Sequence, residues 1–143
     1  MNFLVVDDQS TMRSLVKGML NKMGYKDVEE ADDGSVGLNM LKQKPYGLVI
    51  SDIHMTQMSG LEFLKETRST SAIKDAKFML VTTESSKAAV LEAIKYKVNG
   101  YILKPFTFEA FLEKLKLLGI EPVAVADKPE VQAWGSEAGT PSS

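Results

Sequence analysis

Short apolar runs alternate with segments of helical period along the first 119 residues of the chain. The apolar runs predict strands at residues 3–6, 27–31, 48–50, 78–81 and 101–103, of which the second is the weakest. The other segments predict helices at about residues 11–23, 34–44, 60–68, 87–97 and 108–118. Strands that are apolar throughout are typical of a parallel sheet covered by helices on both faces. The pattern therefore predicts an α/β fold, with five βα units in a doubly wound five-stranded sheet.

The apolar stripes of the helices predict which side chains face the core. They consist of Met12, Leu15, Val16, Met19, Leu20 and Met23 in the first helix, Val36, Met40 and Leu41 in the second, Val90, Leu91 and Ile94 in the fourth, and Phe108, Phe111, Leu112, Leu115 and Leu118 in the fifth. Three helix starts have capping residues. Ser10 is the expected N-cap of the first helix, Ser59 and Glu62 form a capping box for the third, and Thr107 caps the fifth.

The composition excludes several classes of protein. A chain of 143 residues is long enough for one domain with a real core. No apolar run approaches the roughly 18 residues of a membrane span, and no signal peptide is visible, so we expect a cytoplasmic protein without a membrane segment. The absence of cysteine excludes disulfides, thiolate metal sites and thiol catalysis.

Residues 120–143 differ in character from the body formed by residues 1–119. They are rich in Pro, Ala, Gly, Ser and Thr, and they carry Glu121, Asp127, Glu130 and Glu137 against Lys128. This composition is typical of an acidic linker or a disordered tail. The alternative is a tail that docks on the body through its apolar residues, which are Val123, Val125, Val131 and Trp134.

Polar side chains gather where the predicted strands end. Asp7 and Asp8 follow the first strand, Asp52 the third, Thr82 the fourth and Lys104 the fifth. Open α/β sheets bind ligands at the carboxyl edge of their strands. In the order 2-1-3-4-5 these four strands are contiguous and about 4.8 Å apart, so the side chains converge on one pocket.

The chemistry of these residues predicts a site for a phosphoryl group. Two carboxylates about 4 Å apart repel each other by roughly 4 kcal/mol at an effective dielectric constant near 20, so three carboxylates require a counter-ion. An all-oxygen donor set suits Mg²⁺. Lys104 adds a positive charge and Thr82 adds a hydroxyl. In such a site one carboxylate attacks phosphorus, while the other groups orient the phosphoryl group and neutralise its charge.

Three other functions fit the sequence less well. A Mg²⁺-dependent phosphatase of the haloacid dehalogenase type would carry a DxDxT motif, which neither Asp7-Asp8 nor the residues after Asp52 provide. A dinucleotide-binding protein would carry G-x-G-x-x-G after the first strand, and this motif is missing. No helix-turn-helix or basic module is present, so we expect no nucleic-acid partner.

The segments "LVVDD", "LVISDIHMTQMSG", "MLVTTE" and "GYILKPFT" resemble those of two-component receiver domains. The resemblance spans residues 1–119, and within the family it is greatest to the single-domain chemotaxis regulators. It implies the flavodoxin-like receiver fold with strand order 2-1-3-4-5.

The resemblance also implies the role of each acidic residue. Asp52 would accept a phosphoryl group from a histidine kinase. Asp8, Asp52 and the backbone carbonyl of His54 would bind Mg²⁺, and Asp7 would act in the outer shell through water. Such a domain is not an enzyme in the usual sense, because it catalyses only its own phosphorylation and slow dephosphorylation.

The resemblance assigns the remaining site residues to the response. Lys104 would contact the phosphoryl oxygens, and Thr82 would donate a hydrogen bond to one of them. Tyr101 matches the aromatic switch position, whose ring turns as Thr82 moves. The bond between Lys104 and Pro105 would be cis.

Two further features concern residues near the phosphoacceptor. His54 and Glu84 are similar in position to residues that tune hydrolysis in receivers. The family usually has Met-Pro after the phosphoacceptor, whereas here Met55 is followed by Thr56. Losing the proline makes the unfolded loop entropically freer but removes no ligand.

The function that the resemblance implies is a phosphorylation-activated switch. Its surface of fourth helix, fifth strand and fifth helix would bind an output protein, such as a flagellar motor switch component, and a phosphatase is a further possible partner. Lysines on this surface, which are Lys95, Lys97, Lys114 and Lys116, would attract an acidic partner. The alternatives within the family are a phosphate sink, a relay carrier and the excised receiver of a transcription regulator.

Overall fold

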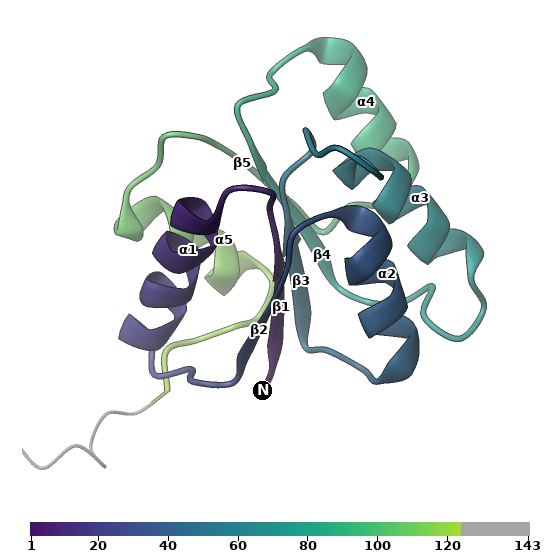
Figure 1. Ribbon diagram of the computed structural model, residues 1–143. Helices are drawn as coiled ribbons and strands as arrows, with labels where there is room; N and C mark the ends of the chain where they lie inside the picture. Colours follow the sequence, from purple (N-terminus) through teal and green to yellow (C-terminus); the bar gives the residue numbers. More distant parts are fainter. Residues whose placement is uncertain (124–143) are drawn as a thin grey trace, which may run out of the picture.

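The computed structural model describes residues 1–123, which form a five-stranded parallel sheet (Figure 1). The strands are β1 (Phe3–Val6), β2 (Val28–Ala31), β3 (Leu48–Ser51), β4 (Phe78–Thr82) and β5 (Gly100–Leu103). All neighbouring strands pair in parallel, in the order β2-β1-β3-β4-β5. The predicted fold class and strand order are therefore confirmed.

Five helices cover the two faces of this sheet. They are α1 (Ser10–Lys22), α2 (Gly34–Gln43), α3 (Gly60–Ser69), α4 (Lys87–Lys95) and α5 (Phe108–Leu117). Helices α1 and α5 lie on one face, and α2, α3 and α4 lie on the other (Figure 1). The predicted elements are all present, with ends that differ by one or two residues. No helix among residues 1–123 is long and apolar enough to cross a membrane.

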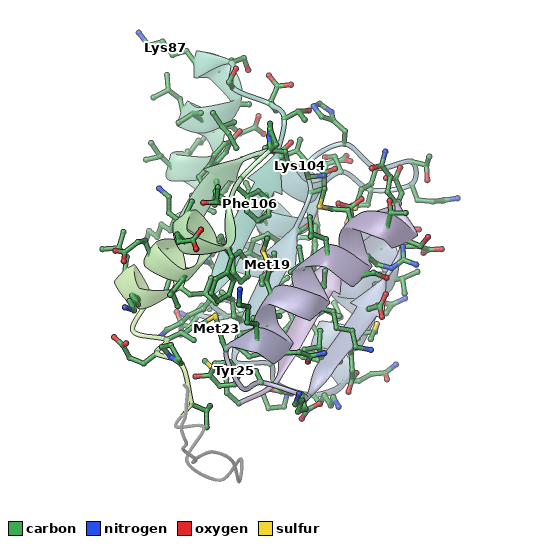
Figure 2. All side chains as sticks on the ribbon, turned by 90° about the vertical axis from the view of Figure 1, so that its left-hand side faces the viewer. Met19, Met23, Tyr25, Lys87, Lys104 and Phe106 are labelled. Carbon is green, nitrogen blue, oxygen red and sulfur yellow. The ribbon has the colours of Figure 1, made fainter. Side chains whose placement is uncertain are left out.

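The strands are apolar throughout because each face of the sheet has its own core. Phe3 and Val5 of β1 join the core under α1 and α5, whereas Leu4 and Val6 join the core under the other three helices. Figure 2 looks onto the α1 and α5 side and labels four side chains that pack along the first core, namely Met19, Met23, Tyr25 and Phe106. Because successive side chains of a strand point to opposite faces of the sheet, one apolar strand contributes residues to both cores.

Local capping residues fix most of the helix starts. The capping box of Ser59 and Glu62 is present, and Thr107 accepts a hydrogen bond from the backbone N–H of Ala110 at 3.0 Å. The N-cap of α1 is Gln9 and not Ser10, so that prediction is wrong. The carbonyl of Gln9 accepts from the N–H groups of the first turn, and its side chain makes no capping hydrogen bond.

Four predicted core side chains are instead exposed. Leu91 and Ile94 of α4 are 54% and 60% exposed, and Leu15 and Val36 are 46% and 40% exposed. In α4 the buried positions are Ala89 and Ala93, because this helix turns its small residues to the protein. A stripe predicted from the larger apolar residues was therefore wrong for α4, whose outer face is apolar.

The chain remains packed on the body for a few residues after α5. Ile120 is 2% exposed and belongs to the core under α1 and α5. The N–H of Val123 donates to the carbonyl of Met23 at 2.8 Å, and the hydroxyl of Tyr25 donates to the carbonyl of Glu121. The rest of the acidic segment, with the predicted docking residues Val125, Val131 and Trp134, lies outside the described residues.

Candidate functional site

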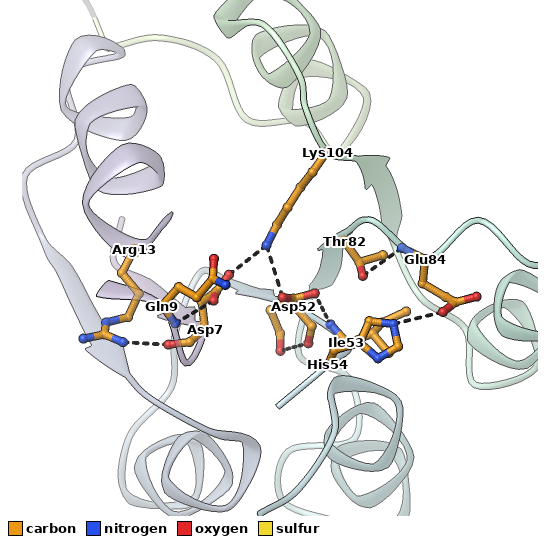
Figure 3. A network of polar contacts seen from close by, with 10 residues as sticks. Asp7, Gln9, Arg13, Asp52, Ile53, His54, Thr82, Glu84 and Lys104 are labelled. Carbon is orange, nitrogen blue, oxygen red and sulfur yellow. Dashed lines mark hydrogen bonds and ion pairs between the residues drawn. The ribbon is translucent and has the colours of Figure 1, made fainter. Parts of the chain in front are cut away.

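The polar residues that follow the strands meet at one edge of the sheet (Figure 3). Lys104 Nζ donates to Asp7 Oδ2 and to Asp52 Oδ2, each at 3.1 Å. The three side chains are 10%, 4% and 12% exposed, respectively. The strand order brings them together, since β3 lies beside β1 and β4 lies between β3 and β5.

Asp7 is held by hydrogen bonds at four different atoms. Its N–H donates to the carbonyl of Ala31 at 3.1 Å, and its Oδ1 accepts from the N–H of Gln9 at 2.9 Å. Its carbonyl accepts from Arg13 Nη1 at 2.7 Å, and its Oδ2 accepts from Lys104. Burial raises the pKa of Asp7, and the hydrogen bonds from Gln9 and Lys104 offset part of that rise.

Three carboxylates in this site lie close enough to share a cation. Oxygen atoms of Asp7, Asp8 and Asp52 all lie within 4.8 Å of one another. The single ammonium of Lys104 does not balance three carboxylates. The donors are hard oxygens without a thiolate or an imidazole, so the site fits Mg²⁺ better than zinc.

The carboxylate of Asp8, unlike that of Asp7, is free to bind a cation. It is exposed, and within the part of the chain that the structure describes no hydrogen bond holds its carboxylate. Both carboxylate oxygens of Asp7, in contrast, already accept hydrogen bonds. Asp8 can therefore turn its oxygens to a cation without breaking a protein contact.

Two glycines, Gly60 at the start of α3 and Gly34 at the start of α2, hold the loop between β3 and α3 that carries Asp52. A Cβ atom on Gly60 would lie 1.9 Å from the carbonyl oxygen of Asp52, so only glycine permits this approach. The N–H of Gly60 donates to the carbonyl of Ile53 at 2.8 Å, and the N–H of Gly34 donates to the carbonyl of Met58 at 3.2 Å. The loop is thus fastened at both ends, with Thr56 exposed between them.

Thr82 and Tyr101 are joined through the main chain of Glu84. The N–H of Glu84 donates to Thr82 Oγ1 at 3.2 Å, and the hydroxyl of Tyr101 donates to the carbonyl of Glu84 at 2.5 Å. Thr82 is fully buried, Tyr101 is half-buried, and this burial raises the pKa of the Tyr101 hydroxyl. A movement of Thr82 therefore has a direct route to the ring of Tyr101.

The side chains of His54 and Glu84 pair beside this site. His54 Nε2 lies 2.9 Å from Glu84 Oε1 (Figure 3). Hydrogen bonds from Ser86, and then from His54, lower the pKa of Glu84. The imidazole thus has a carboxylate partner outside the group of three aspartates.

The peptide bond between Lys104 and Pro105 is cis, as the resemblance implies. The N–H of Lys104 donates to the carbonyl of Thr82 at 2.9 Å, which continues the pairing of β5 with β4.

The sequence was compared with models of known protein families. Residues 3–116 match the model of the response regulator receiver domain. The chain belongs to this family. The receiver domain therefore acts in phosphorylation-dependent signalling and is not a classical enzyme.

Relatives of the receiver domain are chemotaxis proteins. It is 41% identical to the chemotaxis protein CheY-3 of Vibrio cholerae over 115 residues, which are 80% of this chain and 88% of that protein. It is 42% identical to the chemotaxis protein CheY1 of Helicobacter pylori over 119 residues, which are 82% of this chain and 96% of that protein. The family resemblance seen in the sequence is confirmed.

Solved structures of response regulators share the fold. Vibrio cholerae CheY4 has a TM-score of 0.74 at 34% identity, with 80% of this chain and 95% of that chain covered. The response regulator TrrA of Thermotoga maritima, solved in complex with Mg²⁺ and BeF, has a TM-score of 0.73 at 37% identity, with 82% of this chain and 99% of that chain covered.

Arg13 and Gly60 also shape this site, and neither was predicted to do so from the sequence. Arg13 contacts the main chain of Asp7 from the first turns of α1, and Glu30 of β2 holds Arg13 in turn. Gly60 admits the Asp52 carbonyl. The glycine was visible only as part of a helix start, and no pattern in the sequence indicates that Arg13 turns back to the strand end.

Proposed function

We propose that this receiver domain takes a phosphoryl group from a histidine kinase onto Asp52 and thereby changes its affinity for an output protein. The observation that carries the proposal is the position of the Asp52 carboxylate. It lies 3.1 Å from the ammonium of Lys104, in a cluster with Asp7 and Asp8. The groups that would act as nucleophile, countercharge and cation ligands thus lie together at one edge of the sheet.

The transfer step forms one bond and breaks one. An oxygen of the Asp52 carboxylate attacks phosphorus, and the bond between phosphorus and the histidine nitrogen of the donor breaks. The electron pair of that bond leaves with the donor. The residues that would hold Mg²⁺ are Asp8, Asp52 and the backbone carbonyl of His54, with Asp7 in the outer shell, and the bound cation neutralises charge on the transferring group.

Lys104 and Thr82 respond to the product of this step. The phosphoryl group brings nearly two negative charges to Asp52. Lys104 already points at Asp52, so its ammonium is in reach of the new oxygens. Thr82 would move so that its hydroxyl donates to a phosphoryl oxygen, and this movement would break the hydrogen bond that Oγ1 accepts from the Glu84 N–H, which frees the main chain of Glu84.

The response reaches the surface through Glu84 and Tyr101. The carbonyl of Glu84 accepts from the Tyr101 hydroxyl, so a shift of the Glu84 main chain would reposition the ring. Tyr101 belongs to β5, and α4 and β5 carry exposed apolar side chains, which are Leu91, Ile94 and Leu103. Two states that differ by a few kcal/mol suffice for such a switch.

The exposed residues of this surface favour a protein partner. Leu91 and Ile94 are more than half exposed, and α4 and α5 also carry exposed lysines, among them Lys95 and Lys116. A partner with an apolar face and acidic flanks would match it. By analogy with the chemotaxis relatives, we propose a cytoplasmic role in chemotaxis, with an output partner such as a flagellar motor switch component and with a phosphatase as a further partner. A phosphate sink or relay carrier would not require exposed leucine and isoleucine here.

A phosphorylation assay tests the proposal. The chain is incubated with acetyl phosphate, with and without Mg²⁺, and its intact mass is measured. We expect one phosphoryl adduct that requires Mg²⁺, that is absent in Asp52→Asn, and that persists in the control Asp32→Asn, which changes an exposed aspartate. An adduct on Asp52→Asn would overturn the proposal, and turnover of many phosphomonoesters would indicate a phosphatase instead.

A further inference from the structure

Arg13 links three elements beside the cluster of aspartates. Its Nη1 donates to the carbonyl of Asp7 at 2.7 Å, and its Nε donates to Glu30 Oε1 at 2.9 Å (Figure 3 shows the first contact). The Arg13 side chain is 17% exposed. The guanidinium therefore joins the start of α1, the end of β1 and the edge strand β2.

We infer that Arg13 is a positioning residue for the cation site. This inference rests on the proposed function, because it assigns Arg13 a task at the site where Mg²⁺ would bind. The hydrogen bond from Arg13 to Asp7 goes to the backbone carbonyl and not to the carboxylate. Arg13 acts on the main chain of Asp7, and through that main chain it fixes the direction in which Asp8 leaves the strand.

The carbonyl of Asp7 has no hydrogen-bond partner in the sheet, although its N–H does. The N–H of Asp7 continues the pairing with β2 by donating to the carbonyl of Ala31. The carbonyl of Asp7 lies beyond the end of β1, and Arg13 supplies its hydrogen bond. Because this carbonyl defines the plane of the peptide between Asp7 and Asp8, its partner sets the starting direction of the Asp8 side chain.

Asp8 depends on that direction more than its neighbours do. Asp7 and Asp52 are oriented by hydrogen bonds to their own carboxylates. The Asp8 carboxylate is exposed and, among residues 1–123, is held by no such bond. Its closeness to the other two carboxylates, within 4.8 Å, is therefore governed mainly by the main chain that Arg13 fastens.

The charge of Arg13 and its hydrogen bond to Asp7 predict opposite effects on Mg²⁺ affinity. A guanidinium near a divalent cation repels it, so removal of the charge alone would tighten Mg²⁺ binding. Glu30 balances much of this charge at 2.9 Å. If Arg13 positions Asp8, its removal weakens Mg²⁺ binding instead, and the sign of the change separates the two effects.

Lys17 provides a matched control on the same helix. It lies one turn further along α1, carries the same charge, and its Nζ lies 3.8 Å from Glu30 Oε2. No hydrogen bond or ion pair joins it to Asp7 in the part of the chain that the structure describes. Lys17→Met thus removes the same charge from the same neighbourhood without releasing the Asp7 carbonyl.

The experiment is a Mg²⁺ titration of the full chain, followed by the amide NMR signals of Asp8 and Asp52, with thermal unfolding measured in parallel. We expect Arg13→Met to weaken Mg²⁺ binding by about tenfold, the lower end of the effect of losing an outer-shell partner. We expect Lys17→Met to bind like the parent chain. Arg13→Lys keeps the charge but cannot reach both acceptors in the same way, so it should also bind Mg²⁺ more weakly than the parent.

The outcomes separate this inference from the proposed function. If the parent chain binds Mg²⁺ and a folded Arg13→Met binds it equally or more tightly, the inference is overturned and the proposed function stands. If Arg13→Met does not fold, Arg13→Lys decides in the same way. If Arg13→Met only lowers the melting temperature while its Mg²⁺ affinity is unchanged, Arg13 is structural and the inference fails. If the parent chain binds no Mg²⁺, the proposed function fails first.

Discussion

His54 Nε2 lies 2.9 Å from Glu84 Oε1, although the two residues belong to different loops. His54 lies in the loop after β3, two residues beyond Asp52. Glu84 lies in the loop after β4, two residues beyond Thr82. The pair therefore bridges the two loops beside the carboxylate that we propose as the phosphoacceptor. The family resemblance implies that both positions tune hydrolysis, and in the structure the two side chains are in contact.

Removal of this bridge should shorten the lifetime of the phosphoryl group. In His54→Ala the two loops lose their link, and water gains access to phosphorus. We expect faster loss of the phosphoryl mass after the donor is removed, a similar acceleration in Glu84→Ala, and no further acceleration in the double variant, because both changes break the same contact. Additive effects, or a longer lifetime in His54→Ala, would show that the pair does not act as a unit.

Loss of the Lys104 ammonium should destabilise the metal-free protein and uncouple its response. Lys104→Ala leaves the carboxylates of Asp7 and Asp52 without the ammonium group that they share. Removing one partner of a buried ion pair lowers the free energy of unfolding by about 3 kcal/mol. Mg²⁺ should restore part of this loss and bind more tightly than in the parent chain. We expect phosphorylation to persist without a change in partner affinity.

Chemical denaturation with and without Mg²⁺ measures the stability part of this prediction. Lys42→Ala, which changes an exposed lysine of α2, is the control and should leave stability unchanged. If Lys104→Ala were as stable as the control variant without Mg²⁺, the ammonium would not be the counter-ion of the two aspartates. If its phosphorylated form bound a partner as well as the parent does, Lys104 would not couple the site to the surface.

Gly60 should tolerate no side chain, because its Cβ would collide with the main chain of Asp52. The expected contact is 1.9 Å to a carbonyl oxygen, which cannot rotate away. We expect Gly60→Ala to lower the unfolding free energy by about 1–3 kcal/mol and to slow phosphorylation by acetyl phosphate, since relief of the clash displaces Asp52. In Gly18→Ala, where nothing lies within 4 Å of the new Cβ, stability should rise by about 0.8–1 kcal/mol. Equal effects of the two variants would contradict this account of the loop.

The N-cap of α2 should make stability depend on pH. The Ser35 hydroxyl donates to Asp33 Oδ1 at 2.5 Å and, with backbone N–H groups, lowers the pKa of Asp33. A lowered pKa means that the stabilisation is present above the unfolded value of about 3.9 and is lost as pH falls through the folded value. Asp33→Ala should therefore cost about 1 kcal/mol near neutral pH.

The comparison with Asp33→Asn isolates the charge in that N-cap. Asparagine also accepts the capping hydrogen bonds, so Asp33→Asn should keep most of the stability near neutral pH but lose the dependence on acid. Urea unfolding of both variants at pH 7 and pH 3 measures the difference. A gap between the parent and Asp33→Ala that stays constant over this range would contradict the assignment.

The sequence predicted the site better than it predicted the surface. Strand order and strand ends suffice to bring Asp7, Asp52 and Lys104 together, because the sheet imposes their spacing. The outer face of α4 was not predictable in this way. The larger Leu91 and Ile94 were predicted to face the core, but the buried positions are the smaller Ala89 and Ala93. Only the packed helix shows which side chains remain exposed.

Contacts made by the main chain were also beyond the sequence pattern. Arg13 pairs with a carbonyl, and any residue has one, so no partner residue could indicate the contact. The same holds for Glu84, whose backbone N–H and carbonyl groups link Thr82 to Tyr101. The side chain of Glu84 suggested a tuning role, whereas its main chain is the part that connects the two switch residues.

Amide hydrogen exchange upon phosphorylation tests the central claim most directly. The claim is that a phosphoryl group on Asp52 acts through Thr82 and the Glu84 peptide on α4 and β5. We predict that phosphorylation with acetyl phosphate and Mg²⁺ changes exchange at residues 83–91 and 100–104 in the parent chain and in the control Thr83→Ala. Thr82→Ala should accept the phosphoryl group without that change. Unaltered exchange in the phosphorylated parent chain, or a full response in Thr82→Ala, would contradict the account.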